Sequence, residues 1–297
     1  MSESRAGVLL GLAAYLMWGA FPAFFKTIAS VPPSEVLAHR ILWSAAFLFL
    51  FISAVGGHES LKTIIRDRRT VVILTASTCF LAANWFTFLV AVANGKILES
   101  SLGYFINPLV SILLGAIFLG ERLTARQRIS ISLAAAGVFI QTLMVGRLPL
   151  ISLILAFSFG SYGLVRKSAR VQPVSGLAVE MTIMFPAALG YLAFLLARGK
   201  AGFLAGTTGL DILLVLSGVV TATPLILFGG ALNRLRLSTI GIMQYIVPTG
   251  HFLLAVFAFG EPFTTGHLVS FSFIWAALAL YMSESFQAPR PPASGGV

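Results

Sequence analysis

Ten apolar stretches, each close to the length needed to cross a bilayer, occupy this chain from Gly7 to about Ser283. A hydrocarbon core about 30 Å thick requires roughly 20 apolar residues per helix. Ten such helices with short loops use nearly all of the 297 residues, so we expect no separate soluble domain. The sequence therefore predicts an all-α polytopic membrane protein with spans at 7–27, 35–55, 70–93, 98–119, 126–145, 149–165, 176–197, 211–232, 237–259 and 264–284.

Composition argues against an ordinary soluble protein. The chain is 58% hydrophobic with a mean hydropathy of +0.94, and only 10% of its residues are charged, against about 25% in a soluble domain. The net charge of +10 does not indicate nucleic-acid binding, because the basic residues lie in the loops between apolar spans. The first span has only Arg5 before it and no small-residue cleavage pattern after it, so we expect a retained helix rather than a signal peptide.

The basic residues are divided unevenly between the two sets of loops. Fourteen of the 20 Lys and Arg residues fall on the side of the N-terminus, five fall on the opposite side, and Arg40 lies within a span. The positive-inside rule places the richer side in the cytoplasm, so we expect both termini there. Residues 287–297, rich in Pro, Ala, Ser and Gly, are expected to form a disordered cytoplasmic tail.

The second five spans repeat the first five. With an offset of 141, the residues Gly160, Lys167, Pro173 and Ser175 align with Gly19, Lys26, Pro32 and Ser34; with an offset of 140, Pro248, Gly260 and Glu261 align with Pro108, Gly120 and Glu121. Because each copy has an odd number of spans, the copies must be inverted relative to one another, as in many secondary transporters. We predict a five-helix repeat at 1–147 and another at 148–286, enclosing a central cavity.

Four stretches resemble one transporter family. They are HRILWS (39–44), SLGYFINPL (101–109), YGLVRK (162–167), and RLRLST with QYIVP (234–248). Together they are similar to the RarD type of the drug/metabolite transporter superfamily, and each half resembles an EamA domain. The resemblance covers nearly the whole chain. It implies a basket-like bundle of ten helices around a cavity, a bacterial inner-membrane location, and export of small metabolites or drugs without ATP.

Ionisable residues inside a span are costly and are functional candidates. Glu35, His39 and Arg40 open the second span: Arg40 is suited to hold a substrate carboxylate, and His39 with Glu35 to relay a proton. The alternative is a self-neutralising structural cluster near the outer interface. Glu180 aligns opposite His39 and is a candidate for binding a substrate amine or taking up a proton. Its alternative role is to pair with a basic loop residue at the cytoplasmic surface.

Polar side chains also form stripes along the fourth and ninth spans. Ser100, Tyr104, Asn107 and Ser111 follow helical spacing, and Gln244 and His251 are seven residues apart on one face. Such side chains face the bundle, where some only bond helix to helix. The predicted substrate-binding residues are Trp18, His39, Arg40, Asn84, Trp85, Tyr104, Asn107, Tyr162, Glu180, Gln244, Tyr245 and His251. For Trp18, Trp85 and Tyr162, anchoring at the membrane interface is the alternative to forming an aromatic cavity wall.

Prolines and glycines suggest mechanical and packing roles. Proline removes a backbone donor and tends to kink a helix; the candidates for gating are Pro22, Pro108, Pro224 and Pro248. Gly7, Gly11 and Gly19 share one face of the first span, which favours close helix packing. Glu121 and Glu261 follow the fourth and ninth spans, where a carboxylate can cap exposed backbone donors.

Missing motifs narrow the function class. No phosphate-binding loop, H-E-x-x-H or G-x-S-x-G motif occurs, so we expect neither an enzyme nor a cofactor or metal. We predict a secondary transporter that exports small amphipathic metabolites, amino acids or drugs by alternating access. Its expected partners are the small-molecule substrate and the lipid bilayer; proton coupling and ion-free exchange both stay open. The alternatives are an importer of similar solutes and a non-transporting membrane scaffold or sensor.

Overall fold

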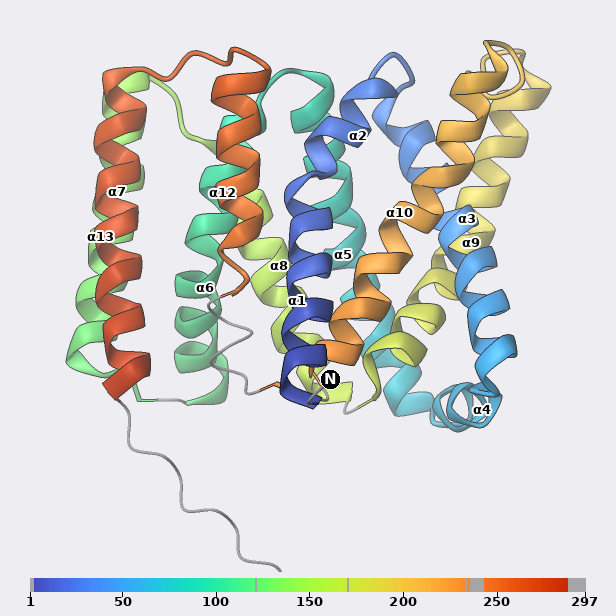
Figure 1. Cartoon of the computed structure of the whole chain (residues 1–297), viewed down its shortest axis with the longest axis horizontal. Helices are drawn as coiled ribbons and strands as arrows, with labels where there is room; N and C mark the ends of the chain where they lie inside the picture. Colours follow the sequence, from blue (N-terminus) through green and yellow to red (C-terminus); the bar gives the residue numbers. More distant parts are fainter. Residues whose placement is uncertain (1–2, 121, 170, 233, 236–242, 288–297) are drawn as a thin grey trace, which may run out of the picture.

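The computed structural model describes residues 3–120, 122–169, 171–232, 234–235 and 243–287. Every regular element within these ranges is a helix, and the long helices stand side by side in one bundle (Figure 1). The predicted all-helical class is confirmed. The expected tail lies outside the described residues except for Gln287, which ends the last helix.

The helices follow the predicted spans closely. The first half contains α1 (Glu3–Gly19), α2 (Phe21–Thr27), α3 (Pro33–Val55), α4 (His58–Arg66), α5 (Arg68–Ala93), α6 (Ile97–Leu119) and α7 (Ala125–Val145). The second contains α8 (Leu150–Ala169), α9 (Pro173–Ala197), α10 (Thr208–Leu232), α12 (Ile246–Leu253), the π-helix η1 (Leu254–Ala258) and α13 (Thr265–Gln287).

Length and composition identify several of these helices as membrane spans. Among the described residues, α3, α5, α6, α9, α10 and α13 are long and apolar enough to cross a bilayer, and the bent pair α1–α2 makes a seventh candidate. Helices α7, α8 and α12 with η1 occupy the other three predicted spans but do not meet the same criterion. A polytopic membrane protein is therefore established, while the count of ten spans stays a prediction.

Two predicted spans differ in detail from the structure. The first is broken: α1 ends at Gly19, α2 begins at Phe21, and their axes differ by 41°. In the ninth, the described helix begins only at Ile246, and the predicted start at 237 lies outside the described residues. Pro22 and Pro248 thus fall in the first turns of α2 and α12, where a missing N–H leaves no intrahelical bond unmade.

The other prolines lie within helices, where each removes a backbone donor. Pro108 is inside α6 and Pro224 inside α10, as predicted, and Pro186 inside α9 is an additional case. Helix α4, between the second and third spans, was not expected from hydropathy. It forms because one side is apolar: Ile64 is buried against Leu74, while Glu59 and Lys62 pair on its exposed side.

Close backbone approaches hold the helices together. A Cβ at Gly103 on α6 would lie 2.7 Å from the Ser152 carbonyl oxygen on α8, and one at Gly250 on α12 would lie 2.9 Å from the Cα of Gly19 on α1. The predicted packing role of the glycine stripe on α1 is confirmed, since a Cβ at Gly11 would meet the Met243 side chain at 2.8 Å. Small residues at such crossings allow the close contact that drives helix association in lipid.

These contacts give a stability prediction. Replacing Gly103 by Ala should push α6 away from α8 and lower the free energy of unfolding by about 1–3 kcal/mol. Gly190→Ala on α9 is the matched control, because no atom lies within 4 Å of the added Cβ. The measurement is thermal unfolding of detergent-purified protein. Equal melting temperatures for the two variants would contradict the proposed crossing.

Candidate substrate cavity

A cavity of about 390 Å³ lies inside the bundle. Its wall is mostly aromatic and apolar, and side chains from both halves of the chain contribute to it. The lining residues are Tyr15, Trp18, Phe21, Arg40, Leu81, Asn84, Trp85, Phe88, Tyr104, Phe159, Tyr162, Arg166, Val171, Leu177, Thr221, Leu225, Phe228, Gln244, Val247, Pro248 and His251. A pocket of this size and character suits a small organic molecule.

The cavity brings together most of the predicted substrate-binding residues. Eight of them line it: Trp18, Arg40, Asn84, Trp85, Tyr104, Tyr162, Gln244 and His251. The other four, His39, Asn107, Glu180 and Tyr245, lie outside this wall. Three lining residues that carry polar groups were missed from sequence: Tyr15, Arg166 and Thr221. Arg166 was counted only as a loop cation, and Thr221 stands in a span where the nearby polar residues, Ser217 and Thr223, are uncharged.

Arg40 projects from α3 into the cavity wall and is only 3% exposed. Its Nε donates a hydrogen bond of 2.7 Å to the hydroxyl of Thr221 on α10. The guanidinium carbon lies 4.1 Å from the ring centre of Trp85 and 5.0 Å from that of Phe25, so aromatic faces surround it. Its Nη1 atom is buried and has no hydrogen-bond partner among the described residues.

Glu35 and His39 do not neutralise Arg40, although the three lie together in the sequence. Glu35 Oε1 accepts hydrogen bonds from the backbone N–H groups of Gly202 and Phe203, at 2.7 and 3.1 Å. His39 Nδ1 accepts one from the indole of Trp43, and its Nε2 lies 3.9 Å from Glu35 Oε1. The pair therefore ties α3 to the connection between α9 and α10, away from the cavity.

Glu180 forms a second buried polar cluster, with Arg166, Ser77 and Tyr162, next to the cavity wall. Its carboxylate lies 3.4 Å from Nε of Arg166 and accepts hydrogen bonds from Ser77 at 2.5 Å and from Tyr162 at 3.2 Å. Glu180 itself is fully buried. The Arg166 guanidinium lies directly against Gly176, where a Cβ would collide with it. Arg166, unlike Arg40, therefore has a carboxylate counter-ion.

Three polar side chains meet on the wall between these clusters. The Asn84 amide donates to the Leu155 carbonyl and the Ser158 hydroxyl, and its oxygen accepts from Tyr104 at 3.3 Å. The ring of Tyr104 packs edge-on against that of His251, with centroids 5.4 Å apart. His251 Nε2 must donate to the Trp18 carbonyl oxygen, at 3.1 Å, so its Nδ1 is a buried acceptor without a partner.

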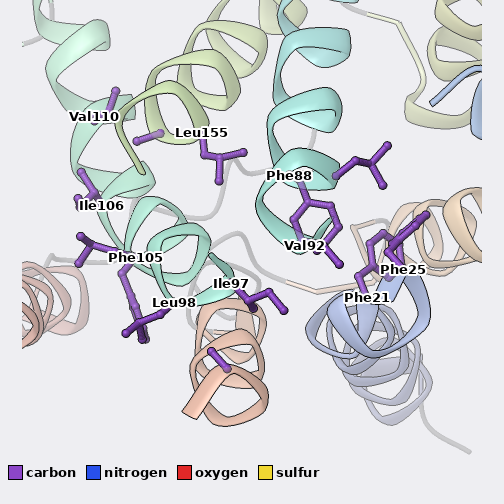
Figure 2. Close-up of a cluster of buried hydrophobic side chains, with 14 of the residues drawn as sticks. Phe21, Phe25, Phe88, Val92, Ile97, Leu98, Phe105, Ile106, Val110 and Leu155 are labelled. Atoms are coloured by element: carbon purple, nitrogen blue, oxygen red, sulfur yellow. The ribbon is translucent and has the colours of Figure 1, made fainter. Parts of the chain in front are cut away.

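Aromatic rings pack against one another at one end of the cavity. Phe21 and Phe25 of α2 face Phe88 of α5, with Phe25 and Phe88 centroids 5.9 Å apart (Figure 2). Beyond them, Lys26 donates to the Val92 carbonyl oxygen. At its other end the cavity reaches Val171, in the connection between α8 and α9.

A carboxylate from the second half caps a helix of the first half. Both oxygens of Glu261 accept backbone hydrogen bonds at the start of α6, from Ile97 and Leu98, each 2.8 Å long. The predicted capping role of Glu261 is confirmed, but the capped helix is α6 rather than the helix that follows it in sequence. Its repeat partner Glu121 lies outside the described residues.

Comparison with known proteins identifies the class. The model of the EamA-like transporter family matches residues 5–143. Protein RarD of Escherichia coli K12 is 44% identical over 97% of this chain and 97% of its own length. The uncharacterized transporter YojE of Bacillus subtilis is 41% identical over 94% of each chain. The chloramphenicol-sensitive protein RarD of Pseudomonas aeruginosa is 31% identical over the full length of both.

A solved crystal structure aligns with 99% of this chain and 100% of its own, with a TM-score of 0.59 and 21% identity. That likeness shows a shared fold. Fold and sequence together define a membrane transporter of the EamA-like family. Within that class, the chain belongs to the RarD type of the drug/metabolite transporter superfamily.

The contact between Gly176 and Arg166 gives a second prediction. Gly176→Ala should displace the guanidinium from Glu180 and lower the free energy of unfolding by about 1–3 kcal/mol. Gly163→Ala on α8 is the control, since nothing lies within 4 Å of its added Cβ. Combined with Glu180→Gln, Gly176→Ala should cost less than it does alone, because the pair is already lost. Strictly additive changes in unfolding free energy would contradict the coupling.

Proposed function

We propose that this protein is a secondary transporter whose two inverted halves, 1–147 and 148–286, expose the central cavity alternately to the two sides of a bacterial inner membrane. The observation that carries the proposal is the aromatic-walled cavity, which contains buried polar groups from both halves, in a chain of a transporter family. Its volume of about 390 Å³ fits a small organic solute. The solutes expected are amphipathic metabolites, amino acids or drugs.

The pattern of helix contacts supports the inverted repeat. If α1, α3, α5 and α6 correspond to α8, α9, α10 and α12, the packing of α5 on α8 has its counterpart in that of α10 on α1. The packing of α6 on α8 likewise matches that of α12 on α1. If α7 likewise corresponds to α13, each helix should also pack on its own counterpart near the axis, and three such pairs are in contact: α3–α9, α6–α12 and α7–α13. A twofold axis between the halves produces this pattern.

The ends of the cavity support a cytoplasmic-facing conformation. From the Lys/Arg distribution we expect the α8–α9 connection on the cytoplasmic side, with both termini. The cavity reaches this connection at Val171, whereas Phe21, Phe25 and Phe88 close the opposite end. A state loaded from the cytoplasm is the one an exporter needs first.

Conformational exchange requires elements that bend. Pro108 and Pro224 lie within α6 and α10, and the α1–α2 break precedes Pro22. Pro248 contributes through its carbonyl oxygen, which accepts a hydrogen bond of 2.8 Å from Ser101 on α6. In this proposal, these positions flex as the closed end opens and the cytoplasmic end shuts.

The test is solute flux in proteoliposomes. Purified protein is reconstituted, and the efflux and uptake of radiolabelled amino acids and cationic drugs are compared with those of protein-free vesicles. Protein-dependent flux that needs no ATP supports a secondary transporter, and its preferred direction separates an exporter from an importer. A reconstituted protein that moves none of these solutes would favour the scaffold or sensor alternative.

Proton coupling is tested at Glu180, the buried carboxylate next to the cavity. If it takes up a proton during transport, Glu180→Gln should flatten the pH dependence of flux, because glutamine cannot titrate. Glu59→Gln, an exposed carboxylate on α4, is the matched control and should leave the profile unchanged. An identical pH profile in Glu180→Gln and the unsubstituted protein would remove Glu180 from this role.

A further inference from the structure

The charges on the cavity wall are all of one sign. Two guanidinium groups, Arg40 and Arg166, line it, and within the described residues no Asp or Glu does. Arg166 is neutralised by Glu180 at 3.4 Å. Arg40 has no carboxylate within salt-bridge distance in the part of the chain that the structure describes, so the cavity carries one uncompensated positive charge.

Glu35, the acidic residue nearest to Arg40 in the sequence, is not its counter-ion. Glu35 is fully buried, and its Oε1 is occupied by the backbone N–H groups of Gly202 and Phe203. Arg40 is five positions after Glu35, which places the two side chains about 140° apart around α3. They therefore face different surroundings, and the charge of Glu35 is used at the α9–α10 connection.

The residues around Arg40 fix the orientation of its guanidinium group, but they neither neutralise its charge nor accept hydrogen bonds from all of its donors. Thr221 donates its own proton to the Ser217 carbonyl oxygen at 2.7 Å, which turns a hydroxyl lone pair toward Nε of Arg40. Trp85 stacks on the guanidinium face, and such contacts compensate only part of the cost of burying a cation. Because Nη1 has no hydrogen-bond partner in the described part of the chain, the guanidinium retains hydrogen-bonding capacity.

We propose that Arg40 is an anion subsite, and that the solutes bound in the cavity are organic anions: a carboxylate joined to an apolar, ring-sized body. The carboxylate supplies the missing counter-ion and accepts hydrogen bonds from the fixed guanidinium, which is pre-oriented for such a group. The aromatic wall, including Trp85 and Phe88, receives the ring. This inference rests on the proposed function and specifies its substrate class.

The test compares probes that differ only in charge. Purified protein in detergent at pH 7.5 is titrated with indole-3-acetate, indole-3-acetamide and tryptamine, and with phenylacetate and phenylacetamide as a second pair. Binding is measured by isothermal calorimetry and by the shift in melting temperature, because a ligand of the folded state raises it. Each acid should bind about tenfold more tightly than its amide, or better, and tryptamine should bind least.

Variants assign the preference to Arg40. Arg40→Gln should bring the affinity for acid and amide to parity, whereas Arg40→Lys, which keeps the charge without the planar fork, should retain part of the preference. Arg198→Gln is the matched control: it removes an exposed guanidinium that also packs on an aromatic ring, Phe194, and should leave the preference intact. If a variant fails to fold, the comparison of acid and amide binding in the unsubstituted protein still tests the proposal.

The outcomes separate this inference from the transport proposal. Equal binding of acids and amides, absence of binding by both acids, or an acid preference that survives in Arg40→Gln would overturn the anion subsite. Acid-selective binding without flux in proteoliposomes would refute transport and leave the subsite standing. Flux of neutral or cationic solutes, with no preference for acids in binding, would support transport and refute the anion subsite.

Discussion

Helices in a bilayer gain little by burying apolar side chains, because the surrounding lipid is as apolar as the side chains themselves. This bundle is instead held by close backbone approach and buried hydrogen bonds. Gly103 lets α6 contact α8, and Asn84 joins α5 to both of them. Because exposing a polar side chain to the hydrocarbon of the bilayer costs free energy, the polar side chains of these helices face the interior of the bundle. The cavity forms where they and the bulky aromatic rings leave space.

The buried carboxylates have different kinds of partner at the two ends of the cavity. Glu180 and Arg166 satisfy one another near the α8–α9 connection, and Glu35 and Glu261 bond to backbone groups of the opposite half near the closed end. The contacts of Glu35 and Glu261 connect the two halves, and a conformational change can break them. Arg40 is oriented by Thr221 but has no carboxylate within salt-bridge distance among the residues that the structure describes. We propose that this charge is left for a bound solute to neutralise.

Hydropathy located most helices to within a few residues, because length and apolarity are what a bilayer requires. It did not reveal the break at Gly19–Phe21, helix α4 or the π-helix at 254–258, which depend on local packing rather than on average apolarity. Helical spacing selected Tyr104 and Gln244, and the polar neighbour Asn84 selected Trp85; all three line the cavity. It could not show that Glu35 and His39 turn away from Arg40, or that Arg166 enters the wall, because side-chain partners come from other helices.

The central claim is that the two halves have opposite orientations around the cavity, and accessibility of corresponding loops tests it most directly. In a Cys79→Ser background, single cysteines are placed at Thr63 and Ala205, both exposed and both between the second and third spans of their half. A membrane-impermeant maleimide applied to spheroplasts should label Ala205→Cys at once, and Thr63→Cys only after the membrane is permeabilised. Labelling of both cysteines from the same side would show that the halves are parallel and would contradict the account.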